Sequence, residues 1–127
     1  MLDYPQLVIN ALQKIEEISV NQLFLKQQQG KINLIDVREE DEVKDGVIPG
    51  SIWVPRGLLE FQIVAITQQL GWKSDDGIYI CCRSGNRSAL AAVSLLEMGF
   101  KKPISVAGGF TAWRDTGYTS TKEMLHF

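Results

Sequence analysis

Short, mostly apolar runs alternate along this chain with stretches in which apolar residues recur every three to four positions. The short runs, at residues 33–37, 51–54, 78–81 and 104–106, are typical of strands buried in a parallel sheet. The helical spacing occurs at residues 5–17, 19–29, 59–70, 89–96 and 110–115. Strands and helices that alternate in this way predict an α/β domain with a mainly parallel central sheet and helices on both faces.

Local signals set the limits of several of these helices. Ser19 and Gln22 have the spacing of a capping box, and Gly30 and Gly71 stand where helices are expected to end. We expect residues 1–17 to form an N-terminal accessory helix, residues 18–120 the domain, and residues 121–127 a C-terminal tail. The charge-rich stretch at 38–45 is expected to be a short, solvated helix.

Composition narrows the functional classes. The chain has 127 residues and a net charge of −2, so it fits one domain and lacks the basic excess of a nucleic-acid or anionic-membrane binder. Its two cysteines are adjacent and its one histidine is His126, which argues against a disulfide framework, a metal site or any cofactor. No apolar run could span a membrane and no leader is visible at Met1, so the expected location is the cytoplasm.

The loop at residues 82–88 carries the candidate chemistry, because it joins a strand to a helix. Backbone N–H groups and the helix N-terminus converge there and form a cradle for an anion. Gly85 permits positive φ, while Arg83 and Arg87 add two positive charges. We expect a thiol in this cradle to ionise readily without a histidine base.

The two adjacent cysteines are expected to differ in role. Alternation along a strand turns Cys81 and Cys82 to opposite sides of the sheet, and the position of Gly85 three residues after Cys82 favours Cys82 as the nucleophile. Cys81 is then a buried apolar residue. The polar residues Ser84, Asn86 and Ser88 are expected to orient the backbone of the loop or to cap the helix that follows it. Ser88 is also expected to donate a hydrogen bond to the sulfur anion.

This loop resembles the active-site loop of the rhodanese family of sulfurtransferases, which runs from a catalytic cysteine in the form Cys-x-x-Gly-x-Arg. The other matching motifs are Asp36-Val37-Arg38, the segment 46–51 and Gly108-Gly109 followed by Trp113. Val47 stands where the family usually has a histidine, a position generally taken to be architectural. The resemblance implies a rhodanese-like fold and a persulfide formed on Cys82.

The resemblance also implies the partners of the reaction. The donor would be thiosulfate or a persulfide, the acceptor a thiol, cyanide or a protein, and the substrate-binding residues would be Arg83, Ser84, Gly85, Asn86, Arg87 and Ser88. No nucleic acid, membrane or cofactor is implied, and the oligomeric state is left open. A competing interpretation is a non-catalytic module that carries a persulfide or only docks a partner.

A cysteine phosphatase is the second alternative, because Cys81 to Arg87 also has the spacing Cys-x5-Arg. Against it, Ile80 occupies the position where those phosphatases resemble one another in having a histidine, and the glycine falls at the wrong offset from Cys81. The loop counted from Cys82 is one residue shorter. It predicts a smaller cradle, suited to a sulfane sulfur rather than a phosphoryl group.

Two groups of residues outside the loop are expected to be structural. Asp36 and Arg38 flank a strand end and could form a buried ion pair that holds the junction between strand and loop. Trp53, Trp72 and Trp113 are expected to be core or near-core aromatics, since their spacing does not suggest a stacking platform.

Overall fold

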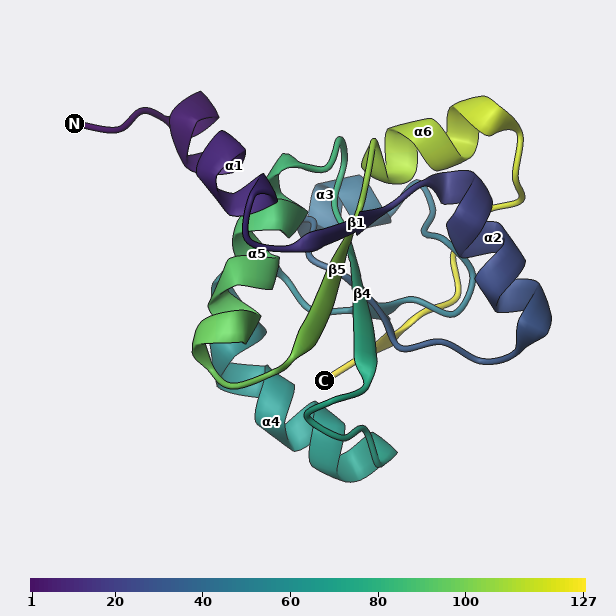
Figure 1. Cartoon of the computed structure of the whole chain (residues 1–127). Coiled ribbons are helices and arrows are strands. Elements are labelled where there is room, and N and C mark those ends of the chain that lie inside the picture. The colour runs from purple at the N-terminus through teal and green to yellow at the C-terminus, as the bar shows by residue number, and fades with distance from the viewer.

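Six strands form one sheet in the computed structural model, which describes residues 1–127 (Figure 1). The strands are β1 (Glu16–Ile18), β2 (Leu34–Asp36), β3 (Ile52–Trp53), β4 (Gly77–Cys81), β5 (Lys102–Val106) and β6 (Leu125–His126). Their order is β1-β5-β4-β2-β3-β6, and every neighbouring pair is parallel. The predicted α/β architecture with a parallel central sheet is confirmed.

Helices cover both faces of the sheet (Figure 1). The helices are α1 (Tyr4–Leu12), α2 (Val20–Gln29), α3 (Glu40–Val43), α4 (Leu59–Leu70), α5 (Asn86–Glu97) and α6 (Gly109–Thr116), with a 3₁₀ turn at Arg56–Leu58. One face carries α4 and α5, with α1 packed against α5, and the other face carries α2 and α6. None of these helices combines the length and apolar character needed to cross a bilayer.

The core is divided by the sheet into two apolar clusters. The cluster beneath α4 and α5 includes Ile35, Ile80 and Cys82, whereas the cluster beneath α2 and α6 includes Cys81 and the fully buried Trp113. Alternation along β4 produces this division, because successive side chains leave a strand on opposite faces. The prediction that the two cysteines face opposite ways is therefore confirmed.

Local helix signals act as expected at two places. Ser19 and Gln22 form the capping box that starts α2, with Ser19 Oγ 3.1 Å from the Gln22 nitrogen. Gly71 ends α4 with φ +74°, a conformation that glycine adopts without steric cost. These signals are encoded within a few residues, so no long-range contact was needed to predict them.

The predicted first helix is wrong at its C-terminal end. Helix α1 stops at Leu12, and Glu16–Ile18 forms the edge strand β1, which pairs with β5 in the register Glu16↔Ile104. Ile15 continues the helical spacing in the sequence, although it lies after the end of α1. It is apolar because it packs against the core cluster beneath α4 and α5. A three-residue edge strand leaves no period-two pattern, so only its partner reveals it.

The C-terminal tail also joins the sheet. Leu125 and His126 pair with β3 as strand β6, and Thr121 forms an isolated bridge with Val47. The backbone nitrogen of Val47 lies 2.7 Å from the Thr121 carbonyl oxygen. The Val47 side chain is fully buried. An apolar side chain suits this site, and the architectural interpretation of position 47 agrees with its surroundings.

The charged stretch at 38–45 is less solvated than predicted. It contains the four-residue helix α3, but Arg38 is only 3% exposed and Val43 only 2%. Arg38 is buried because its guanidinium binds Asp36 and the Gly46 carbonyl. The outward residues of this segment remain exposed, as expected: Glu39, Glu40 and Asp41.

Candidate active site

The candidate loop lies at the carboxyl end of β4, a central strand between β5 and β2. Strand β4 ends at Cys81, the chain turns through Gly85 with φ +99°, and α5 begins at Asn86. A side chain other than hydrogen at Gly85 would be strained at this φ, and its Cβ would lie 3.2 Å from the Gly108 nitrogen. The turn therefore requires glycine for two independent reasons.

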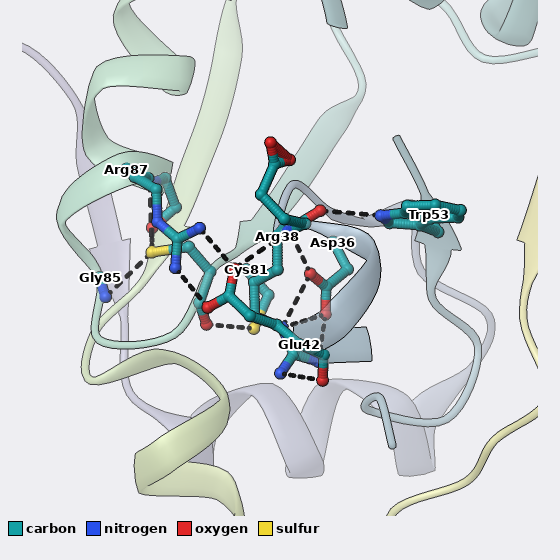
Figure 2. A network of polar contacts seen from close by, with 10 residues as sticks. Asp36, Arg38, Glu42, Trp53, Cys81, Gly85 and Arg87 are labelled. Carbon is teal, nitrogen blue, oxygen red and sulfur yellow. Dashed lines mark hydrogen bonds and ion pairs between the residues drawn. The ribbon is translucent and has the colours of Figure 1, made fainter. Parts of the chain in front are cut away.

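Two backbone donors and one hydroxyl surround the sulfur of Cys82. The N–H groups of Gly85 and Ser88 point at Sγ with nitrogen–sulfur distances of 3.1 and 3.3 Å, and Ser88 Oγ lies 3.3 Å away. Figure 2 shows the Gly85 nitrogen directed at this sulfur. The Cys82 side chain is 1% exposed, so these donors act with little competition from water. The predicted convergence of loop amides on one point is therefore present, and that point is the Cys82 sulfur.

Helix α6 holds the cradle from behind. The N–H of Phe110 donates to the Cys82 carbonyl at 2.8 Å, and the N–H of Thr111 donates to the Arg83 carbonyl at 3.0 Å. Gly109, with φ +56°, allows this approach, because a Cβ there would collide with the Cys82 carbonyl oxygen and lie 2.7 Å from the Arg83 carbonyl. The Gly108-Gly109 pair is thus part of the support of the loop.

Arg87 binds Glu42 of α3. Its two terminal nitrogens lie 2.7 and 2.8 Å from the two carboxylate oxygens, a bidentate geometry visible in Figure 2. The hydrogen bonds from Arg87 lower the pKa of Glu42 from 4.5 to about 2, and the same contact raises the pKa of Arg87. Glu42 was not singled out in the sequence, because it is one of four consecutive acidic residues and nothing local distinguishes it.

Asp36 and Arg38 form the expected buried ion pair. Arg38 Nη2 lies 2.9 Å from Asp36 Oδ2, and the exposed fractions of the two side chains are 3% and 0%. The guanidinium also donates to the Gly46 carbonyl and lies over the Phe110 ring, 4.3 Å from its centroid. Burial raises the pKa of Asp36, while the hydrogen bonds from Arg38 offset part of that rise. This pair joins β2 to the 46–50 segment and to α6.

Cys81 has the opposite environment to Cys82. It is fully buried, its Sγ lies 3.3 Å from the Cys82 carbonyl oxygen, and burial raises its pKa well above the usual value for a thiol. Figure 2 draws this second sulfur beside Asp36 and Arg38, away from the Gly85 nitrogen. The environment of Cys81 favours an inert thiol.

The remaining predicted site residues do not contact the sulfur. Arg83, Ser84 and Asn86 are exposed, and no hydrogen bond joins their side chains to the sulfur. Arg83 lines a cavity of about 270 Å³ that it shares with Glu42, Phe110 and Arg114, among others. The structure thus brings Gly85 and Ser88 to Cys82, whereas Arg87 binds Glu42 and Arg83 lines the neighbouring cavity.

Ser105 on β5 is a site residue that the sequence did not reveal. Its Oγ lies 2.7 Å from Ser88 Oγ, and both serines are fully buried. Strand alternation could have placed Ser105 on the same sheet face as Cys82, since Ile104 and Val106 belong to the other cluster. Its distance from Ser88 depends on the pairing of β4 with β5, which the sequence does not state.

Comparison with known protein families identifies the family of this chain. The model of the rhodanese-like domain matches residues 19–116, which is most of the chain and includes the loop and the three other motifs. The chain belongs to the rhodanese-like family. The rhodanese-like domain described here has the sulfurtransferase or sulfur-carrier proteins of that family as its relatives.

Two relatives indicate the range of this family. Over 88 residues the rhodanese-like domain is 39% identical to YrkF of Bacillus subtilis, a proposed sulfur carrier protein, covering 69% of this chain and 43% of YrkF. It is 31% identical over 84 residues to a sulfurtransferase of Allochromatium vinosum, covering 66% of this chain and 73% of that protein. The chain thus spans less than half the length of YrkF.

Solved structures support the same fold. A protein of unknown function from Rhodopseudomonas palustris, titled a possible tyrosine phosphatase, has a TM-score of 0.82 and 31% identity over 95% of this chain and 96% of its own. The polysulfide-sulfur transferase of Wolinella succinogenes has a TM-score of 0.72 and 29% identity, covering 90% and 83% of the two chains.

Proposed function

We propose that this rhodanese-like domain is a sulfurtransferase in which Cys82 carries the transferred sulfur as a persulfide. The observation that supports this most is the convergence of the Gly85 N–H and the Ser88 N–H on one sulfur atom, with the Ser88 hydroxyl oxygen also 3.3 Å from it. Donors fixed in this way stabilise a thiolate before reaction, and they are suited to the negative charge of a terminal persulfide sulfur afterwards.

The proposed reaction has two half-reactions. The Cys82 thiolate attacks the outer sulfur of thiosulfate, a new S–S bond forms, the original S–S bond breaks, and sulfite leaves with the bonding electron pair. An acceptor thiolate or cyanide then attacks the outer sulfur of the persulfide, and the Cys82 thiolate leaves. The chain is regenerated with no net oxidation, and the order of steps predicts ping-pong kinetics.

The two arginines have different roles in this proposal. Arg87 is already bound to Glu42, so it holds the start of α5 against α3 and contributes its charge at a distance from the sulfur. Arg83 is exposed and has no carboxylate partner, so it is free to bind an anionic donor at the mouth of the loop. Ser84 and Asn86, exposed beside it, are proposed to contact the donor together with Arg83.

A sulfur-carrier role is the second candidate, and the relationship to YrkF favours it. In that role the same persulfide on Cys82 passes to a protein acceptor rather than to a small thiol or cyanide. Both roles need the cradle. They differ in turnover, since a carrier would form the persulfide and turn over slowly with small acceptors alone.

The geometry argues against phosphatase chemistry from Cys81. A Cys-x5-Arg loop that started at Cys81 would need that sulfur inside the cradle, but Cys81 lies on the opposite face of the sheet with a raised pKa. The amides that point at a sulfur, those of Gly85 and Ser88, lie in the loop that starts at Cys82 and in the first turn of α5 that follows it. A shorter loop encloses less space, which suits a single sulfur atom better than a phosphoryl group.

Incubation with thiosulfate followed by intact-mass measurement tests the proposal. We expect the wild type to gain one sulfur atom, Cys82→Ser to gain none, and the matched variant Cys81→Ser to behave as the wild type. Steady-state kinetics with thiosulfate and cyanide then separate the two roles, because parallel double-reciprocal lines indicate a transferase, and a persulfide without turnover indicates a carrier.

An adduct that survives in Cys82→Ser and disappears in Cys81→Ser would overturn the assignment of the nucleophile. Hydrolysis of an aryl phosphate by the wild type, with no sulfur gained from thiosulfate, would support the phosphatase instead.

A further inference from the structure

A cavity of about 410 Å³ lies between α2 and the edge of the sheet, on the face opposite to the Cys82 side chain. Figure 1 shows β1 at this edge and its continuation into α2. The volume lies within the range of small-molecule pockets. The cavity shares no residue with the loop at 82–88, so it is separate from the candidate active site.

The strand register places three residues of this cavity in one row across the sheet. Tyr79 of β4 pairs with Ile104 of β5, which pairs with Glu16 of β1. Paired residues in a parallel sheet point to the same face, so all three side chains leave the sheet on the side of α2. Lys102 stands two residues before Ile104 and shares that face. The apolar floor of Ile104 and Ile18 therefore has a carboxylate at the sheet edge and an ammonium group one row away.

Tyr79 brings a polar atom without a partner to the cavity. Only 9% of this residue is exposed, and its hydroxyl makes no hydrogen bond within the chain. Burial raises the pKa of Tyr79 and the charge of Glu16 raises it further, so the hydroxyl keeps its proton at neutral pH. A largely buried hydroxyl without an acceptor is costly, and a ligand that accepts its hydrogen bond would remove that cost.

Two carboxylates and two ammonium groups surround the apolar floor. They belong to Glu16 and Glu17 of β1, to Lys26 of α2 and to Lys102 of β5, and none of the four takes part in an ion pair. Opposite charges that line one cavity without meeting leave both signs open to a ligand. This distribution of charge is complementary to a molecule that carries a cation and an anion of its own.

We propose that this cavity binds a small zwitterion with an apolar side chain, of the class of a free amino acid or a dipeptide. The ammonium group of the ligand pairs with the carboxylates of β1. Its carboxylate pairs with the two lysines and accepts a hydrogen bond from Tyr79, and its side chain covers the isoleucine floor. The inference goes beyond the proposed sulfur transfer and uses no residue of the Cys82 loop.

The test is a titration of the full chain, labelled with ¹⁵N, with L-leucine and with the dipeptide leucyl-leucine, followed by amide chemical shifts. We expect saturable shifts confined to residues 16–18, 22–29, 77–79 and 102–104, with a dissociation constant of about 1 mM or below for at least one probe. No saturable shift with either probe, or shifts centred on the loop at 82–88, would overturn the inference.

Three matched ligands test each part of the zwitterion. The N-acetyl derivative of leucyl-leucine lacks the ammonium group, its C-terminal amide lacks the carboxylate, and glycyl-glycine lacks the apolar side chains. Each should bind about tenfold more weakly than leucyl-leucine. Equal affinities for all four ligands would contradict the assigned class.

A conservative variant tests the hydroxyl of Tyr79. Tyr79→Phe keeps the ring on the floor of the cavity and should weaken the binding of leucyl-leucine about fivefold. The matched control is Tyr4→Phe, which removes the hydroxyl of an exposed tyrosine on α1 and should leave the affinity unchanged. An unchanged affinity in Tyr79→Phe would show that the hydroxyl does not bind the ligand and would overturn this contact.

A charge variant locates the ammonium group of the ligand. Glu16→Gln should weaken the binding of leucyl-leucine but not that of its N-acetyl derivative, because the derivative has no ammonium group to lose. Glu40→Gln, on the exposed face of α3, is the matched control and should affect neither ligand. Equal weakening of both ligands by Glu16→Gln would contradict the inference. None of these titrations uses thiosulfate, so their failure is distinct from a failure of sulfur transfer.

Discussion

Two neighbouring strand-to-helix junctions at the same edge of the sheet have the same backbone geometry, but their N–H groups bind different acceptors. Strand β4 runs through Gly85 into α5, and strand β5 runs through Gly108 into α6, with the two glycines at φ +99° and +75°. At the first junction the free N–H groups converge on the Cys82 sulfur. At the second, the N–H groups of Phe110 and Thr111 are used by the carbonyls of the first loop.

The difference shows that a helix N-terminus offers a set of free N–H donors, and that the neighbouring segments determine which acceptors these donors bind. Both junctions could bind an anion by their local geometry. Because β5 lies beside β4, the second junction touches the back of the first loop and stabilises its carbonyls. One junction therefore directs its donors at the Cys82 sulfur, and the other holds the first loop in place.

The largest expected effect comes from breaking the second junction. In Gly109→Ala the new methyl group would collide with the Cys82 carbonyl, in a backbone conformation at φ +56° that already disfavours alanine. We expect a loss of about 3 kcal/mol in the free energy of unfolding, measured by urea titration, together with a fall in sulfur transfer.

Gly117→Ala is the matched control for that variant. Gly117 ends α6 at φ +93°, and a Cβ there would meet no atom within 4 Å. Gly117→Ala should lower the free energy of unfolding by about 1 kcal/mol, the cost of the backbone conformation alone, and should keep the sulfur-transfer activity. Equal losses in the two variants would show that the contact between the junctions contributes nothing.

A smaller effect is expected from the ion pair that ties the first junction to α3. Glu42→Gln should lower the free energy of unfolding at neutral pH by about 1–2 kcal/mol, because Arg87 loses a charged, bidentate partner that is 24% exposed. The matched variant Asp41→Asn removes an exposed carboxylate 3.5 Å from Lys44 and should change stability by less than about 0.5 kcal/mol.

The same variant predicts a pH dependence. The pKa of Glu42 is about 2 in the fold, below its ordinary value of 4.5, so the folded state keeps the carboxylate ionised where the unfolded chain takes up a proton. The stabilisation is therefore present above pH 4.5 and is lost as the pH falls toward 2. Urea titrations across this range should show the difference between wild type and Glu42→Gln shrinking; a constant difference would contradict the assignment.

The smallest effect on stability is expected at the cavity beside the loop, to which each junction contributes an exposed arginine. Arg83 belongs to the first junction and Arg114 to α6, and both line the same cavity. Arg83→Ala should raise KM for thiosulfate several-fold and leave the free energy of unfolding within about 0.5 kcal/mol of wild type. Arg114→Ala should change KM less, and a larger change there would move donor binding to the second junction.

The geometry of the loop could be predicted because its signals are local. Strand alternation separates Cys81 from Cys82, and Gly85 marks the turn that aims the amides, so the choice of Cys82 and the cradle followed from seven consecutive residues. The predicted contribution of Arg87 is a different case. Its charge is visible in the sequence, but its partner Glu42 is 45 residues away and looks like its acidic neighbours.

The edges of the sheet were the least predictable part of the fold. Strands β1 and β6 have three and two residues, and each exists through pairing with a strand remote in the sequence. The helical spacing that ends at Ile15 therefore concealed β1. Short edge strands contain too few residues for a side-chain pattern, so their hydrogen-bond partners define them.

The sequence by itself determined the α/β architecture, the position of the candidate loop and which cysteine faces its amides, because each depends on periodicity or on residues within one turn of each other. Tertiary structure alone decided that α6 supports the loop, that Glu42 binds Arg87, and that Ser105 reaches Ser88. Those contacts join segments far apart in the chain, and they arise from the order and register of parallel strands, which no local pattern encodes.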